Sequence, residues 1–411
     1  MGRGRNTKQN GSLFAVDTSH VGILDGMRAI GVLGVLWFHF WQQTWLMPIY
    51  RTPFLNWMGV RGIYPDIFRR SGYLFVDLLL LISAFVLYLP HARSIFFGTQ
   101  IDSTKTFYKK RVARIVPSYM FAVVFMFIVA LIEGKYVGKT GFAVKDLLTH
   151  LTFTTMAFND TYLFTCINGV LWTVCIEVCF YLMFPLLAKA FRKKPIPTYL
   201  LMMSIGLIFT YAIAPSIAEP RVMVNRFLTF LPVFANGMMA AQLYVWYAAR
   251  VRRKAIPSIV GTIVSIASIW VILLLFTACT RAMKNQQVWQ MQYRVVLSFA
   301  YTAWILGTAI SIRPMRKILD NPVLASTAAV SYNLYIWHHW IILHFRESFG
   351  ASNGGDIAKA GAETQWTLTL MGLAAAFLIA VIVTYGVERP VSRLIMKTNK
   401  EKKDAHYGES Q

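Results

Sequence analysis

The feature that most constrains this chain is a series of apolar runs, several of which reach the roughly 20 residues that a helix needs to cross a bilayer. Of its 411 residues, 56% are hydrophobic and 14% are charged, whereas about 25% are charged in typical soluble domains. A backbone surrounded by lipid must satisfy its own hydrogen bonds, so long apolar runs predict helices. The sequence therefore predicts an all-α polytopic membrane protein, a bundle of about ten transmembrane helices. We expect the spans near 22–46, 71–90, 116–132, 169–188, 198–215, 225–248, 256–278, 293–312, 323–345 and 365–387.

The distribution of Lys and Arg predicts the orientation. Ten spans place both termini on one side of the membrane. The segments on that side carry 26 Lys and Arg residues, and the segments on the opposite side carry 14. Because cytoplasmic loops are enriched in these residues, both termini are predicted to be cytoplasmic. The net charge of +23 lies in short clusters between spans rather than on one face, so we expect no nucleic-acid binding.

The domain organisation follows from these spans. We expect a cytoplasmic N-terminal segment (1–21), a membrane-embedded domain (22–390) and a charged, disordered cytoplasmic tail (391–411). Among the segments outside the spans, 143–158 is the best candidate for a re-entrant or interfacial helix. The four cysteines have no metal-ligand spacing, so no metal is expected. A disulfide between two of them, Cys166 and Cys279, stays open.

Ionisable residues inside the spans are the main functional signal. Asp25, Arg28 and His39 all lie in the first span, although each buried charge costs ~2.5–3.5 kcal/mol on insertion scales. Arg28 and His39 are eleven residues apart and share one helix face. The rise per residue places four such groups, from four helices, in the same outer layer: His39, Asp77, Glu177 and His338.

A basic cluster marks the inner end of the third span. The stretch FYKKRVARIVPSY, residues 107–119, contains Lys110, Arg111 and Arg114. Arg111 and Arg114 are three residues apart, so on a helix they can bind one phosphate-rich ligand together. An ordinary positive-inside cluster would look the same. The residues alone leave both interpretations open.

Taken together, these segments resemble the acyltransferase family 3 membrane proteins from about Leu24 to Pro390. The resemblance rests on six motifs in order. They are L-D-G-x-R followed by His (Leu24, Asp25, Gly26, Arg28, His39), V-D…S-x-F (Val76, Asp77, Ser83, Phe85), the basic cluster (Phe107, Lys110, Arg111, Arg114, Ile115, Pro117, Tyr119), W-T…E-x-x-F-Y (Trp172, Thr173, Glu177, Phe180, Tyr181), S-Y-x-x-Y-x-x-H (Ser331, Tyr332, Tyr335, His338) and E-R-P (Glu388, Arg389, Pro390). Ala84 and Thr173 replace the usual Gly and Ser.

The resemblance implies an acyl-CoA-dependent O-acyltransferase in a bacterial plasma membrane. The donor would be cytosolic acetyl-CoA, a substrate rather than a bound cofactor, and the acceptor a hydroxyl of an extracytoplasmic carbohydrate or glycoconjugate. Lys110, Arg111, Arg114 and Arg28 would contact the donor. His39 would act in catalysis, with Glu177 or Asp77 orienting it. Whether His39 deprotonates the acceptor or carries the acyl group stays open.

Many family members carry an extracytoplasmic esterase-like domain that completes the transfer, and we identify none in this sequence. We therefore expect either that the membrane part acts alone or that a separate extracytoplasmic transferase partner finishes the reaction.

Each candidate also has a structural interpretation. His39 could be a core histidine, and Arg28 could simply pair with Asp25. The remaining motif residues are expected to support the site or to join helices: Trp172, Thr173, Ser331, Tyr332, Tyr335 and His338. Tyr162 and Asn159 in the outer loops, together with Trp57 and Tyr64, are candidates for sugar contacts.

Two other functions compete with this interpretation. Intramembrane charges also mark transport paths, so a secondary transporter, or a flippase of envelope precursors, is the main alternative. No inverted repeat of the kind that marks many transporters is apparent in the sequence. Within enzymes, transfer to an amine also stays open.

Overall fold

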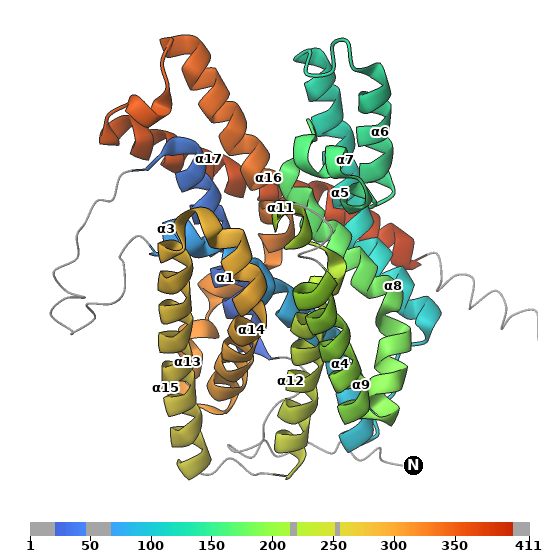
Figure 1. Ribbon diagram of the computed structural model, residues 1–411. Coiled ribbons are helices and arrows are strands. Elements are labelled where there is room, and N and C mark those ends of the chain that lie inside the picture. The colour runs from blue at the N-terminus through green and yellow to red at the C-terminus, as the bar shows by residue number, and fades with distance from the viewer. Residues whose placement is uncertain (1–20, 47–66, 214–219, 251–254, 398–411) are drawn as a thin grey trace, which may run out of the picture.

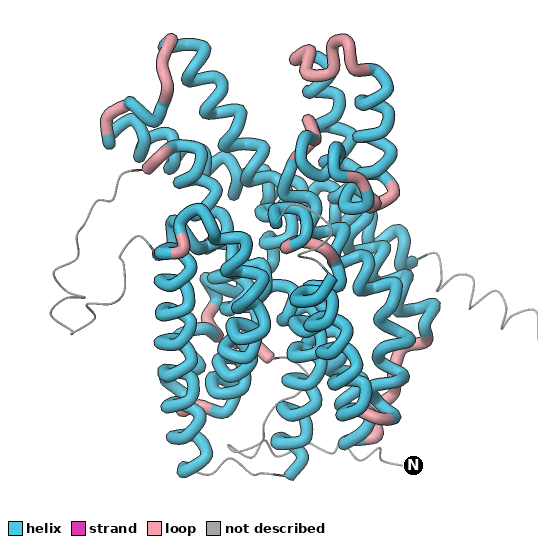
Figure 2. The backbone as a smooth tube through the Cα atoms, viewed as in Figure 1, coloured by secondary structure: helices cyan, strands magenta, loops and turns pink. Residues whose placement is uncertain are grey.

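The computed structural model describes residues 21–46, 67–213, 220–250 and 255–397. Throughout these residues the regular structure is helical, and Figure 2 shows no strand among them. The segment 47–66, with the sugar-contact candidates Trp57 and Tyr64, lies outside the described residues, as do the first 20 and last 14 residues. The predicted all-α class is confirmed.

The long helices occupy the positions of the ten predicted spans. They are α1 (Gly22–Thr44), α4 (Phe75–Phe97), α5 (Thr104–Ile132), α8 (Trp172–Lys193), α9 (Pro195–Ile208), α12 (Leu231–Arg250), α13 (Ala255–Arg281), α14 (Gln286–Ile310), α16 (Pro322–Asn353) and α17 (Ala362–Val383). Shorter helices are α3 (Ile67–Ser71), α6 (Thr140–Leu151), α7 (Asn159–Phe164), α11 (Pro220–Met223) and α15 (Arg313–Leu319). Within the described residues, nine helices are long and apolar enough to cross a membrane. The 32-residue α16 is not among them, because its C-terminal half carries several His and charged side chains.

Local sequence signals explain where several helices begin. Asn321 caps α16, where its side chain accepts a hydrogen bond from the Leu324 amide at 3.0 Å, and proline follows at the first helical position. Ser103 caps α5 in the same way by accepting from the Thr106 amide. A side-chain cap satisfies an amide that has no partner within its own helix, and proline lacks that amide altogether.

The helix ends differ from prediction in two places that matter. Helix α5 begins at Thr104 rather than near residue 116, so the whole basic cluster is helical. At the other end of the chain, helical structure continues past Val383 through a π-helical turn (Thr384–Glu388) to residue 397. Residues 391–397, expected in the disordered tail, are therefore helical. The predicted helix at 143–158 is α6, which covers the first part of that range.

Small residues let the central helices approach closely. Helix α4 packs along α12, and α1 packs along both α16 and α4. At Gly237 of α12, an added Cβ would lie 2.4 Å from the carbonyl oxygen of Leu81 on α4. At Gly26 of α1, it would lie 2.1 Å from the carbonyl oxygen of Leu319. Such close backbone approach is typical of helix packing in membranes. Lipid removes the hydrophobic driving force between helices, so they associate by close van der Waals packing, which small residues allow.

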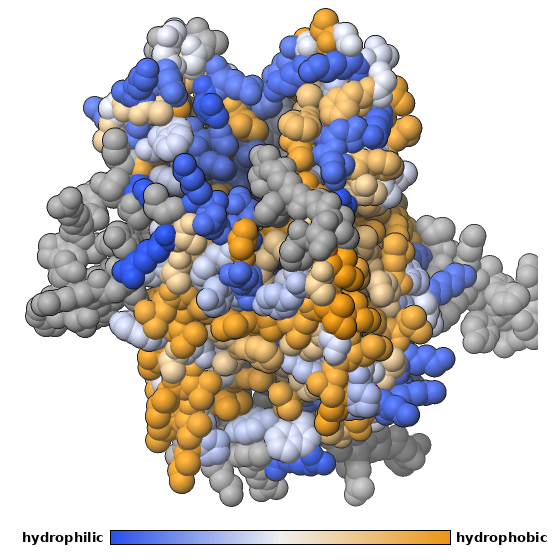
Figure 3. Space-filling view, in the orientation of Figure 1, coloured by the Kyte–Doolittle hydropathy of each residue, from blue (hydrophilic) through white to orange (hydrophobic). Residues whose placement is uncertain are grey.

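Connections alternate between the two ends of the bundle (Figure 1). The turns between α5 and α6 and between α16 and α17 lie at one end, drawn at the top, and the C-terminus of α12 and N-terminus of α13 lie at the other. Apolar side chains form a broad surface band over the lower part of the same view, while polar ones gather on the projecting upper helices (Figure 3). In α13, Ile259, Ile263 and Ile266 are each more than half exposed. This surface is that of a multi-pass membrane protein.

All four cysteines are free. The Cys279 thiol lies 3.1 Å from the Tyr73 hydroxyl, and the Cys166 thiol faces the carbonyl of Lys135 at 3.9 Å. The structure therefore contains no disulfide between Cys166 and Cys279.

Candidate active site

Three cavities follow one another through the bundle and share lining residues. The basic cavity, of about 640 Å³, is lined by Lys110, Arg111, Lys189, Arg192 and Lys193, among others. The arginine cavity, of about 110 Å³, is lined by Arg28, Arg111, Arg114 and Glu177, among others. The histidine cavity, of about 760 Å³, contains His39.

Shared side chains connect these cavities in sequence. Arg111 lines both the basic and the arginine cavities, together with Val86 and Leu87. Tyr335 and Val76 line both the arginine and the histidine cavities. The basic and histidine cavities share no described residue. The arginine cavity therefore lies between the other two.

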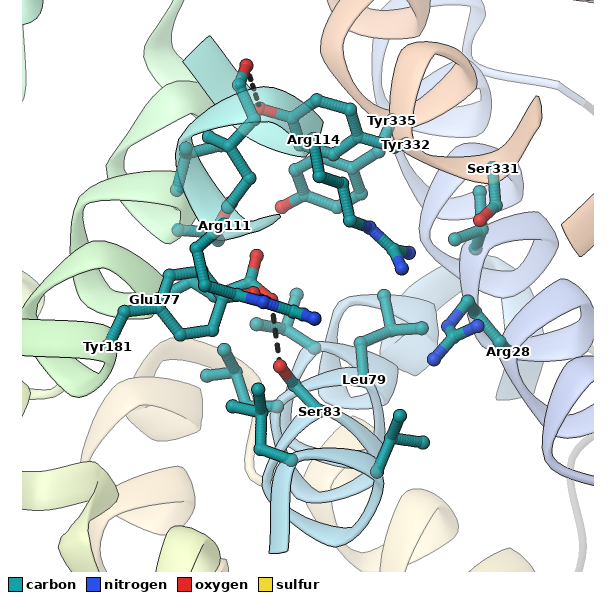
Figure 4. A pocket seen from close by; sticks show the side chains of 18 residues that line it. Arg28, Leu79, Ser83, Arg111, Arg114, Glu177, Tyr181, Ser331, Tyr332 and Tyr335 are labelled. Atoms are coloured by element: carbon teal, nitrogen blue, oxygen red, sulfur yellow. Dashed lines mark hydrogen bonds between the residues drawn. The ribbon is translucent and has the colours of Figure 1, made fainter. Parts of the chain in front are cut away.

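Three guanidinium groups point into the arginine cavity from two helices (Figure 4). Arg28 comes from α1, and Arg111 and Arg114 come from α5. Arg28 also lies 3.4 Å from the carboxylate of Asp25, one turn earlier. Arg28 thus both pairs with Asp25, as the structural interpretation expected, and lines a cavity. Arg111 packs against the rings of Phe107 and Tyr181, 5.8 Å from each centroid.

Glu177 is the carboxylate that faces these arginines (Figure 4). Its Oε1 accepts a hydrogen bond from the Ser83 hydroxyl at 2.8 Å and another from the Tyr181 hydroxyl. Ser83 belongs to α4, whereas Glu177 and Tyr181 are one turn apart on α8. These bonds fix the carboxylate opposite three cations, so the cavity keeps an excess of positive charge in an otherwise apolar layer. An anionic ligand would balance that excess.

Lys110 lies on the side of α5 that faces the basic cavity. Its ammonium group binds the carboxylate of Asp102 at 2.6 Å, and both side chains are exposed. Arg192 and Lys193, at the C-terminal end of α8, line the same cavity. The motifs in the sequence did not single out these two residues, although a basic last turn of a helix beside a basic cluster is a usable signal.

His39 lies among other imidazole rings. Its ring centroid is 4.8 Å from that of His339 and 5.2 Å from that of His338, both on α16. The His338 Nδ1 lies 2.6 Å from the carbonyl oxygen of Tyr335. The His39 Nδ1, His338 Nε2 and His339 Nδ1 are buried with no hydrogen-bond partner. The depth argument put His39 and His338 in one layer, and the structure brings their rings into contact. That argument did not include His339, which also contacts His39.

The structure places neither predicted carboxylate against His39. Glu177 lies in the arginine cavity, and Asp77 is fully buried against Arg294, with the Asp77 Oδ2 3.3 Å from the Arg294 Nε. Arg294 also donates to the Thr229 hydroxyl at 2.7 Å and to the Val224 carbonyl. The expected eighth span, 293–312, put Arg294 at its very start, whereas α14 begins at Gln286 and buries Arg294. The Asp77–Arg294 pair therefore joins α4 to α14.

The remaining motif residues line the cavities or join their helices. Trp172 lines the histidine cavity and packs on Phe230, with ring centroids 6.0 Å apart. Thr173 and Ser331 line the arginine cavity, where each hydroxyl donates to a carbonyl of its own helical segment. The Tyr332 hydroxyl donates to the carbonyl of Ile115 on α5 at 3.2 Å. Tyr335 packs beside His338, with ring centroids 5.4 Å apart. It lines both the arginine and the histidine cavities.

The arrangement suits transfer of a group between two ligands that approach from opposite ends. Among the described residues, no group of three or more His, Cys, Asp or Glu side chains could hold a metal ion. The cavities instead carry arginines and lysines, the carboxylates of Glu177 and Asp102, and imidazoles. They can bind an anion at one end and exchange a proton at the other.

Comparison with known proteins gives one family. Residues 21–385 match the family described as "Acyltransferase domain". A Staphylococcus aureus (strain COL) protein named "Putative O-acetyltransferase" is 25% identical over 350 residues, covering 78% of this chain and 50% of that protein. The O-acetyltransferase OatA of Staphylococcus aureus (strain NCTC 8325) is 26% identical over 342 residues, with the same coverage. The chain thus spans about half the length of the curated relatives it matches. No solved structure matches the chain.

Proposed function

Because the chain belongs to the acyltransferase-domain family, we propose that it transfers an acetyl group from acetyl-CoA to a hydroxyl of a carbohydrate on the opposite side of a bacterial plasma membrane. The observation that carries this proposal is the series of three cavities. Cations line its first two members, and His39, which contacts two further imidazole rings, lines the third. A charged donor and a separate acceptor can then meet without crossing the membrane.

The donor would enter through the basic cavity. Its cations, with Arg111 at the boundary, would bind the phosphate groups of coenzyme A, because guanidinium and ammonium groups form charge-assisted hydrogen bonds with phosphate. The positive-inside distribution supports a cytoplasmic position for this cavity, where acyl-CoA would be the donor. The narrower arginine cavity would receive the pantetheine arm, with Arg28, Arg114 and Glu177 along its walls.

The reaction would take place where the arginine and histidine cavities meet, beside Tyr335. His39, in its neutral form, would accept the proton of the acceptor hydroxyl while the oxygen attacks the thioester carbonyl. The C–S bond breaks as the C–O bond forms, and the proton passes to the departing thiolate, which gives an acetyl ester and free coenzyme A. His338 and His339, which surround His39, would orient its ring in place of the carboxylates first expected.

The relatives' greater length bears on the acceptor step. Either the described membrane domain acts directly on the acceptor, or a separate extracytoplasmic transferase partner carries the acetyl group to it. Both versions use the same three cavities. They differ only in what enters the histidine cavity.

Acetyl transfer by envelope vesicles tests the proposal. Vesicles from cells that express the chain are loaded with acetyl-labelled acetyl-CoA on the cytoplasmic side, and released coenzyme A thiol and glycan-bound label are measured together. We expect equal amounts of both, with label that neutral hydroxylamine releases as an ester. Label that resists hydroxylamine would indicate an amine acceptor. Transported label without thiol release would indicate a transporter and would contradict the proposal.

A further inference from the structure

The histidine cavity has its own cations, separate from those of the donor route. Arg70 on α3 and Lys284 in the 3₁₀ turn Met283–Asn285 line this cavity and neither of the other two. Helix α3 packs against α13, and the turn with Lys284 follows α13, so the two cations come from neighbouring elements. A ligand that stays in the basic and arginine cavities would not meet them.

Neither cation is neutralised by the described part of the protein. No described carboxylate lies within ion-pair distance of Arg70 or Lys284, and no described Asp or Glu lines the histidine cavity. The Arg70 guanidinium instead lies over the ring of Trp41, 5.6 Å from its centroid, and Trp41 also lines this cavity. By contrast, Lys145 on α6 binds the carboxylate of Asp160 at 2.6 Å.

The rest of the lining suits a carbohydrate. Trp172 and Tyr73 supply aromatic surfaces, and Gln42, Gln286 and Gln290 supply amide donors and acceptors. Amphipathic aromatic rings and amides can contact the apolar faces and hydroxyl groups of a sugar. The volume, about 760 Å³, falls within the range of about 300–1,000 Å³ for small-molecule pockets.

From these observations we propose that the acceptor is an anionic carbohydrate, one whose carboxylate or phosphate group is bound by Arg70 and Lys284. The inference rests on the proposed function, in which the histidine cavity receives the acceptor. The two cations would hold the acidic group and leave a hydroxyl free to reach His39 on the wall of the same cavity. A neutral sugar would keep the aromatic and amide contacts but would leave both cations unpaired. Arg70 and Lys284 therefore determine specificity and are not catalytic residues.

A pair of matched oligosaccharides tests the charge preference directly. The full chain, in nanodiscs of phosphatidylcholine, is titrated with trigalacturonic acid and with its fully methyl-esterified form, and binding is followed by tryptophan fluorescence. Trp41 and Trp172 report on this cavity. We expect the charged trisaccharide to bind about tenfold more tightly at low salt, because two exposed cations attract an anion with a strength that salt reduces. The double variant Arg70→Gln/Lys284→Gln should bind both trisaccharides about equally.

Lys139→Gln is the matched control, because Lys139 is an exposed lysine of the α5–α6 turn that lines none of the three cavities. It should keep the full preference. Equal affinity of the wild type for both trisaccharides, no saturable binding of the charged one, or a preference that survives the double variant would overturn the inference. So would a preference that disappears when phosphatidylglycerol is added, because the cations would then bind a lipid headgroup. Binding is measured without acetyl-CoA, so a failure of the acetyl-transfer assay is distinguishable from a failure of this test.

Discussion

The carboxylate of Asp77 and the guanidinium of Arg294 form an ion pair that is almost completely excluded from solvent, with Oδ2 and Nε 3.3 Å apart. Residues 217 positions apart in sequence are thereby joined, and α4 is held to α14 beside the histidine cavity. Removing one partner of such a pair leaves a buried charge uncompensated, whereas removing both does not.

Asp77→Asn and Arg294→Met should each destabilise the protein by about 3–5 kcal/mol, and the double variant Asp77→Leu/Arg294→Met should recover most of that loss. Thermal unfolding in detergent measures all three. Asp160→Asn, which breaks the exposed pair with Lys145, is the control and should cost less than about 1 kcal/mol. Single variants as stable as the wild type would show that the Asp77–Arg294 pair does not hold these helices.

Arg111 and Arg114 should act mainly on donor affinity. Replacing both by Ala removes charge-assisted contacts worth ~1.5–3 kcal/mol each, so the KM for acetyl-CoA should rise by at least one order of magnitude while kcat changes less. Lys109→Ala, on the same helix but outside all three cavities, controls for the loss of charge. If a folded double variant keeps the donor KM of the wild type, the basic cluster does not bind the donor and serves only to orient the protein in the membrane.

The orientation is tested by single cysteines introduced at positions 103 and 145 in a cysteine-free background. Ser103 caps α5 near the basic cavity, and Lys145 lies on α6. In intact cells a membrane-impermeant maleimide should label position 145 readily and position 103 hardly at all. The reverse pattern would place the basic cavity outside the cell and would contradict the donor assignment.

Asp146 gives α6 a pH-dependent stability. Its buried carboxylate accepts hydrogen bonds from the Tyr136 hydroxyl at 2.7 Å and the Cys166 amide at 3.0 Å. Burial raises the pKa of Asp146, but hydrogen bonds from His150, Tyr136 and Cys166 outweigh burial, and the net pKa is lowered. A lowered folded-state pKa contributes stability above the unfolded value of about 3.9, and this contribution is lost as the pH falls through the folded value.

We therefore expect the proteolytic resistance of the α6–α7 segment to be constant from pH 7 to 5 and to fall below about pH 4. Asp146→Asn should be less resistant at neutral pH and should respond less to acid. If the wild-type segment already loses proteolytic resistance between pH 7 and 5, a titratable group other than Asp146 controls its stability.

Much of the fold could be predicted because hydropathy alone locates membrane helices, and the ten expected spans coincide with ten long helices. The helix neighbours could not be predicted, because helix packing depends on side-chain shape. Arg294 illustrates this limit: near the edge of an apolar run it resembles a loop residue, and only the packing of α14 on α4 shows that it neutralises Asp77.

The candidate site was partly predictable for a similar reason. Arg28, Arg111 and Arg114, the expected donor contacts, line one cavity. Glu177 lines the same cavity, although the rise per residue put it in the layer of His39. Depth does not determine direction around a helix axis, however. His39 and Glu177 lie in neighbouring cavities. His339 is about 100° around α16 from His338, yet both rings contact His39.

The measurement that tests the account most directly is the turnover of His39→Gln. Gln keeps similar bulk and hydrogen-bonding capacity but cannot accept a proton at neutral pH. General-base catalysis contributes ~10²–10⁴-fold, so the initial rate of acetyl transfer should fall by about that factor. Acetyl-CoA binding and thermal stability, measured on the same detergent-purified samples, should change little, because the donor contacts lie in the other two cavities. A His39→Gln protein that turns over within about threefold of the wild type would contradict the assignment of His39 as the base.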